Sequence, residues 1–145
     1  MDIHGTVAEQ DESTPVVARQ IPEARRMGTL ARYFGLRALT VENAVYDFMG
    51  QMAPDYQGGY WQFYELDNGG FYMATEGSSY RFSVEGNGYQ GMLSAEAAGI
   101  TVCLFAYSHL SFRYPRDGVF SDHFHRLRAY ASQHPEAGAI FGAID

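Results

Sequence analysis

The spacing of apolar and polar residues divides the chain into helical and extended segments. Apolar side chains recur every three or four residues over Val41–Met52, which predicts an amphipathic helix. A shorter helix is predicted over Met27–Phe34, because Gly35 is a suitable residue to end it. Residues 1–20 show neither the spacing of a helix nor the alternation of a strand. They are polar and acidic, and are therefore predicted to form a flexible acidic tail.

The middle of the chain has the period of two that is typical of strands. Four short alternating runs are separated by turn sequences, among them Asn68-Gly69 and Asn87-Gly88. Such turns join neighbouring strands directly, so the pattern predicts one antiparallel sheet with a buried face and an open face. The predicted strands are Tyr60–Leu66, Phe71–Thr75, Tyr80–Glu85 and Tyr89–Leu93.

Three more helices are predicted after the strands. Ser94 is expected to cap a helix that is apolar nearly all round over Ala97–Tyr107 and is therefore buried on two sides. Ser121 is expected to cap the next helix, whose Phe124, Leu127 and Ala131 are predicted to face inward, and Ala137–Ile144 forms the last. The predicted fold class is α+β, with a single antiparallel four-stranded meander sheet packed with about four helices. Residues 21–145 are predicted to form one domain.

Composition and charge exclude several classes of function. All ten basic residues are arginine, so no Walker lysine, Schiff-base lysine or Ser–Lys dyad exists. The net charge is −7, of which residues 1–12 carry −4, while residues 19–37 carry +4. This acidic balance makes direct DNA binding unexpected. No apolar run approaches the about 18 residues of a membrane span, and a single cysteine excludes an internal disulfide, so a cytoplasmic location is expected.

The motifs that resemble reactive sites have structural explanations. Residues 86–91 match G-x-G-x-x-G, but a strand follows instead of a helix, so a hairpin turn is the better interpretation. His123 and His125 are two residues apart on a predicted helix, where they point to different faces, so they are interpreted as part of a solvated helix and not as metal ligands. Cys103 lies in the apolar helix and is predicted to be buried and inert. No catalytic, metal-binding or cofactor-binding residue is therefore predicted.

Three kinds of surface remain open from the residues alone. Glu65, Asp67 and Glu85 would form paired carboxylates of a small enzyme if they met at one end of the sheet. The tyrosines of the sheet would pack beneath a covering helix or, if exposed beside Arg25-Arg26, would suit a nucleic-acid-binding module or a protein-binding surface. By alternation Trp61, Phe63 and Phe71 are expected to face the core, whereas Tyr60, Tyr64 and Tyr72 are not.

Several long strings of residues resemble the KlcA/ArdB antirestriction family. Two of them, rich in aromatic residues and glycine, surround the first predicted turn, and a third follows the second turn and continues into the apolar helix. Shorter similarities occur in the arginine segment and at the C-terminus. The matching strings are Pro22–Met27, Gly58–Leu66, Asn68–Ala74, Gly86–Tyr89, Ser94–Ile100 and Ala139–Asp145.

This resemblance implies a plasmid- or mobile-element-borne protein that relieves type I restriction, with an α+β fold and no established catalytic residue. We expect a non-enzymatic inhibitor that contacts the type I restriction system or a host factor linked to it. Mimicry of about 40 Å of DNA would need on the order of twenty aligned negative charges, which this chain lacks. A monomer is expected. The candidate partner contacts are Arg25, Arg26, Tyr60, Tyr64, Glu65, Asp67 and Asp145.

Overall fold

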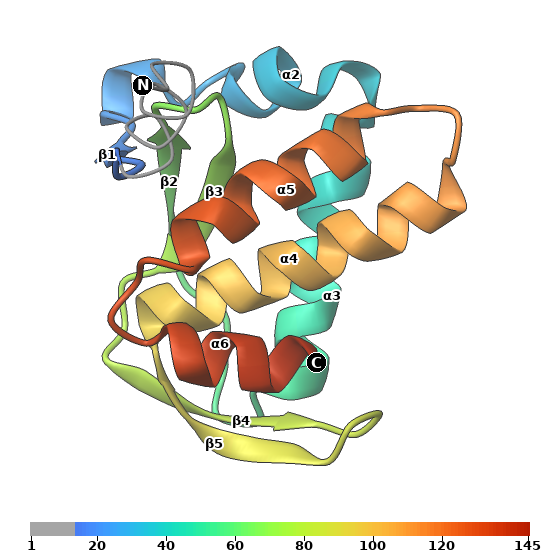
Figure 1. The fold of residues 1–145 in the computed structure, drawn as a ribbon. Coiled ribbons are helices and arrows are strands. Elements are labelled where there is room, and N and C mark those ends of the chain that lie inside the picture. The colour runs from blue at the N-terminus through green and yellow to red at the C-terminus, as the bar shows by residue number, and fades with distance from the viewer. Residues whose placement is uncertain (1–13) are drawn as a thin grey trace, which may run out of the picture.

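The computed structural model describes residues 14–145, so most of the predicted tail lies outside the described residues (Figure 1). Within them, the first strand is β1 (Ala18–Gln20), which pairs antiparallel with β2 (Trp61–Leu66). The predicted tail is therefore wrong for residues 18–20. The side chains of this strand are mostly exposed and show no hydrophobic pattern. Backbone pairing with β2 holds the strand, so the sequence gives no sign of it.

The remaining strands form two small sheets in place of the predicted four-stranded one. Strand β2 pairs with β3 (Phe71–Thr75), giving the order β1-β2-β3. Strands β4 (Ser79–Val84) and β5 (Tyr89–Ser94) form a separate hairpin at the other end of the molecule (Figure 1). The α+β class is confirmed, and all strand pairs are antiparallel. The prediction of a single four-stranded sheet was imprecise, because the strands form two sheets.

Helix α4 (Ala95–Arg113) explains why the sheet divides after β3. The Tyr107 hydroxyl donates a hydrogen bond of 2.6 Å to the carbonyl of Phe71, and the Cys103 thiol lies 3.7 Å from the carbonyl of Met73. Both carbonyls belong to β3, which within residues 14–145 pairs with no strand other than β2. The helix therefore covers the edge of β3 that a fourth strand would have used, and the hairpin packs elsewhere.

The other helices surround α4 (Figure 1). Helix α3 (Ala38–Met52) crosses behind it, α5 (Val119–Ala131) and α6 (Ala137–Ile144) lie on its two sides, and α6 also packs on β5. Two short 3-10 turns, η1 (Glu23–Arg25) and η2 (Gly35–Arg37), flank the short helix α2 (Thr29–Phe34). The apolar helix predicted from its sequence is thus the central element of the core.

The predicted helix caps were right at one position and wrong at the other. The Ser94 hydroxyl accepts a hydrogen bond of 3.0 Å from the backbone N–H of Ala97, as predicted. Ser121 caps nothing, because α5 begins earlier, at Val119. The carboxylate of Asp117 accepts from the Val119 N–H at 3.2 Å and starts the helix two residues before the predicted cap.

The inward face of α5 also differs from the sequence prediction. His123 is 2% exposed and lies on the buried face with Phe120, Leu127 and Ala131. It packs against the rings of Phe34, 4.6 Å away, and Tyr107, 5.8 Å away. The prediction of a solvated histidine was therefore wrong here, whereas His125 is exposed. Phe124, which was expected to face inward with Leu127 and Ala131, is only partly buried, because the buried face of the helix includes Phe120 and His123.

The Ser94 cap leads to a prediction about stability. Replacing Ser94 with alanine removes the acceptor for the Ala97 N–H, and caps of this kind contribute about 1 kcal/mol. The Ser94 hydroxyl also donates a hydrogen bond to the Glu136 carboxylate, so we expect the free energy of unfolding to fall by at least that amount in urea titrations followed by circular dichroism. Ser121→Ala is the matched control, since its helix starts without it. Equal losses in the two variants would contradict this account.

Candidate partner-contact site

Four of the seven predicted contact residues meet where η1 lies against β2. We call Arg25, Arg26, Tyr60 and Glu65 the Arg25–Glu65 cluster. The Arg25 guanidinium lies 3.2 Å from a carboxylate oxygen of Glu65 in a half-exposed ion pair. The Tyr33 hydroxyl donates to the same oxygen at 3.1 Å. The pairing of β2 with β1 and β3 fixes Glu65, so the ion pair anchors η1 to the sheet.

Arg26 joins Tyr60 to the rest of this cluster. Its guanidinium lies over two aromatic rings, 4.0 Å from the centre of Phe63 and 4.4 Å from that of Tyr60. It also donates a hydrogen bond of 2.7 Å to the carbonyl of Trp61. The Tyr60 hydroxyl in turn donates to Glu23 at 2.6 Å. These contacts hold flexible side chains in fixed positions, so the cluster is a pre-organised surface.

The electrostatics of the cluster suit contact better than proton transfer. Burial raises the pKa of Tyr33, and the hydrogen bond to Glu65 raises it further. The hydrogen bond to Glu23 is the main cause that raises the pKa of Tyr60. Both hydroxyls therefore stay protonated at neutral pH. The cluster offers arginine N–H groups and the face of Tyr60, which is 46% exposed, to a partner.

Tyr64 belongs to the opposite face of the sheet, because neighbouring residues of a strand alternate. Its ring stacks on Tyr72 at 4.7 Å, and Tyr72 stacks on Tyr130 of α5 at 5.7 Å. Tyr72 is consequently buried, which corrects the prediction that it lies outside the core. Its hydroxyl donates to Glu96 at 2.7 Å, and burial raises its pKa. Alternation did not reveal Tyr130, which covers this second face.

The last two predicted contact residues lie apart from the cluster. Asp67 follows β2 and accepts a hydrogen bond of 2.9 Å from the Val17 N–H, so it fixes the segment before β1. Asp145 follows α6 and lies at the far side of the molecule, where the C-terminus is marked in Figure 1. The seven residues therefore do not form one continuous site.

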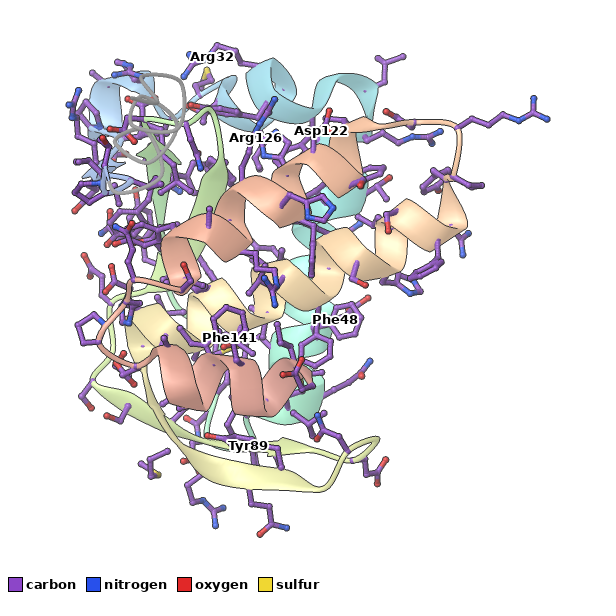
Figure 2. The ribbon with its side chains drawn as sticks, viewed as in Figure 1. Arg32, Phe48, Tyr89, Asp122, Arg126 and Phe141 are labelled. Carbon is purple, nitrogen blue, oxygen red and sulfur yellow. The ribbon has the colours of Figure 1, made fainter. Side chains whose placement is uncertain are left out.

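Sequence reasoning missed one arginine that the fold adds at this end of the molecule. Figure 2 shows Arg126 of α5 and Arg32 of α2 on the same side. The backbone carbonyl of Arg126 accepts a hydrogen bond of 3.0 Å from Asn68 in the turn between β2 and β3. Tertiary contacts bring Arg126 to the turn of the sheet, and no local pattern in the sequence signals them.

The structure does not assemble the carboxylates of the enzyme alternative. Glu65 and Asp67 lie at the end of β2, whereas Glu85 lies in the turn of the hairpin, at the opposite end of the molecule (Figure 1). The turn itself is the predicted one, because Gly88 has a φ of 76° and its N–H donates to the carbonyl of Val84. Residues 86–88 therefore lie in the turn and residues 89–91 in β5, so this segment lacks the turn-to-helix geometry of a dinucleotide site.

The environment of Cys103 does not suit a catalytic thiolate. Cys103 is fully buried, and burial raises the pKa of its thiol to about 12, so it is not a thiolate at neutral pH. In the part of the chain that the structure describes, no group of three His, Cys, Asp or Glu residues could hold a metal ion. Over residues 14–145, no helix is long and apolar enough to cross a membrane.

Comparison with known proteins assigns the chain to a family. A family model described as "Antirestriction protein" matches residues 54–145, which is more than half of the chain. The chain belongs to the antirestriction protein family. It is 45% identical over 139 residues to an antirestriction protein KlcA of Escherichia coli, covering 91% of this chain and 95% of the relative. A second KlcA of that species is 40% identical, with coverage of 92% and 98%.

A further relative and a solved structure extend this family assignment. The uncharacterized protein YafX of Escherichia coli K12 is 42% identical, covering 86% of this chain and 85% of its own. A solved structure matches with a TM-score of 0.84 and 42% identity, over 91% of this chain and 96% of the other. This solved structure comes from a study of the KlcA and ArdB proteins. The study describes a novel fold for them and antirestriction activity against type I DNA restriction systems in vivo but not in vitro. The family resemblance inferred from the sequence is confirmed.

Proposed function

We propose that this protein relieves type I restriction of incoming unmodified DNA by a non-catalytic contact with a protein. The partner would be the type I restriction system itself or a host factor linked to it. The observation that carries the proposal is the match to the KlcA and ArdB structure over 91% of the chain, since that work describes activity against type I systems in vivo. We expect the protein to act as a cytoplasmic monomer.

The charge distribution argues against DNA mimicry. Residues 14–145 contain ten arginines and thirteen Asp and Glu residues, a net charge of −3. Mimicry of about 40 Å of duplex would need on the order of twenty negative charges in line. Among these acids, Glu65, Asp117 and Asp55 are paired with arginines at 3.2 to 3.8 Å. A protein contact is therefore the better explanation of an inhibitory effect.

The difference between activity in vivo and in vitro supports a contact that needs more than the purified enzyme. For KlcA and ArdB, activity was found in cells and not in vitro. A host factor, or a restriction complex in its cellular state, would account for such a difference. In the present chain the Arg25–Glu65 cluster is the proposed contact, because it combines exposed arginine and tyrosine groups in fixed positions.

A plating experiment tests this function. Expression of the protein should raise the plating of unmodified phage on a type I restricting host by at least tenfold, without a change in DNA methylation. Arg25→Ala should reduce this protection, and Arg81→Ala should not, although both remove an exposed arginine paired with a carboxylate. Unchanged plating with the wild-type protein would refute the proposal. Stoichiometric competition with DNA for the purified enzyme would refute the exclusion of mimicry.

A further inference from the structure

A second surface combines exposed apolar side chains with arginines at the junction of η2, α3 and the end of α4. Leu36 is fully exposed, Phe112 is 82% exposed and Leu39 is 66% exposed. Arg37, Arg113 and Arg116 lie beside them in the chain and around a shallow hollow that also includes Tyr114. We call these six residues, three apolar and three basic, the Leu36–Phe112 surface.

Side-chain contacts join the two parts of this surface. The Arg37 guanidinium lies over the Tyr114 ring, 3.7 Å from the ring centre. The Arg113 guanidinium lies 5.7 Å from the same ring centre. Arg113 also donates to the Tyr114 hydroxyl at 3.3 Å, and Arg37 lies 3.8 Å from Asp117. Residues far apart in the chain are thus held together. The surface is built by the fold and is not a chance exposure of separate side chains.

The composition of the surface suits a protein partner. Exposed leucine and phenylalanine side chains leave water when another apolar surface covers them, and arginine and tyrosine are common in the centres of protein interfaces. Three arginines stand against the single carboxylate of Asp117, although residues 14–145 together carry a charge of −3. The local sign is therefore opposite to that of the whole domain, which favours a partner with an acidic surface.

From this arrangement we infer that the Leu36–Phe112 surface docks an acidic protein surface with an apolar centre. The inference rests on the proposed function and names a second part of the contact. Carboxylates of the partner pair with Arg37, Arg113 and Arg116, while its apolar side chains cover Leu36, Leu39 and Phe112. A nucleic acid fits less well, because phosphates gain nothing from exposed leucines and a net charge of −7 repels them.

Two double variants test this surface in the phage-plating assay. Leu36→Ser with Phe112→Ser removes the apolar part, and Arg113→Glu with Arg116→Glu reverses the charge. Each should lower protection at least tenfold while the melting temperature stays within about 2 °C of wild type, because the changed side chains are exposed. Met92→Ser, which changes a 58% exposed side chain on the hairpin, is the matched control and should keep full protection.

The possible outcomes separate this inference from the proposed function. Full protection by either double variant would overturn the Leu36–Phe112 surface and leave the function standing. Absence of protection by the wild-type protein would refute the function, and the surface that rests on it. Salt-sensitive binding of labelled duplex DNA that the Arg113→Glu/Arg116→Glu variant loses would also overturn the inference, because the partner would then be a nucleic acid. Loss of protection in both folded variants, without DNA binding, supports it.

Discussion

Gly99→Ala is expected to destabilise the protein by about 2–3 kcal/mol, although alanine is the better helix former. Gly99 lies inside α4 at the point where the helix crosses β3. A Cβ atom there would be 2.5 Å from the backbone carbonyl oxygen of Met73 and 2.5 Å from the Cβ of Ala74. Because one neighbour is backbone, no change of side-chain rotamer relieves the overlap. Urea unfolding followed by circular dichroism measures the loss.

Gly50→Ala provides the matched control for this experiment. Gly50 also lies inside a helix, α3, but a Cβ atom there would meet no other atom within 4 Å. Alanine should therefore stabilise the protein by up to about 1 kcal/mol, through helix propensity alone. The two substitutions are the same chemically and should have opposite signs. A gain in stability at both positions would show that α4 and β3 do not approach as closely as described.

The second large effect concerns acid pH and His123. The pKa of His123 is lowered from 6.5 to about 4. Burial among aromatic rings is the main cause, and the positive charge of the nearby Arg126 is the second. Between these two pH values the unfolded chain binds a proton at His123 that the folded protein does not. The free energy of unfolding therefore falls as the pH drops through this window, by about 3 kcal/mol below pH 4.

His123→Leu should remove this part of the pH dependence. The Nδ1 atom of His123 is buried without a hydrogen-bond partner, so leucine of similar size removes an unpaired buried polar group. Relative to wild type, the variant should gain stability steadily from pH 6.5 to pH 4 in urea titrations. His125→Asn, which changes an exposed histidine of the same helix, should follow the wild-type curve. Parallel curves for wild type and His123→Leu would contradict the assignment.

Local sequence signals predicted the individual elements well. The last helix has the predicted bounds, Ala137–Ile144, and the strand Phe71–Thr75 was also predicted with its observed ends. Ser94 was identified as a cap because the hydroxyl and the N–H that it accepts from are only three residues apart. Such features depend on neighbouring residues, so a single sequence contains the information needed to predict them.

Long-range contacts account for what the sequence did not predict. Strand β1 exists because its backbone pairs with β2, more than forty residues later, and its own side chains carry no pattern. The division into two sheets depends on α4 covering the edge of β3. In the candidate site, the sequence named Arg25, Tyr60 and Glu65 separately, and their contacts with one another, with Tyr33 and with Glu23 arise only from tertiary packing.

The central position of α4 also has a consequence for synthesis on the ribosome. This helix contacts α3, α5, α6, β3, β4 and β5, and it begins only at residue 95 of 145. The nascent N-terminal part lacks the element against which its apolar residues are buried. We therefore expect the chain to stay open to proteases and chaperones until all of α4, and with it about four fifths of the chain, has left the exit tunnel, and then to fold cooperatively.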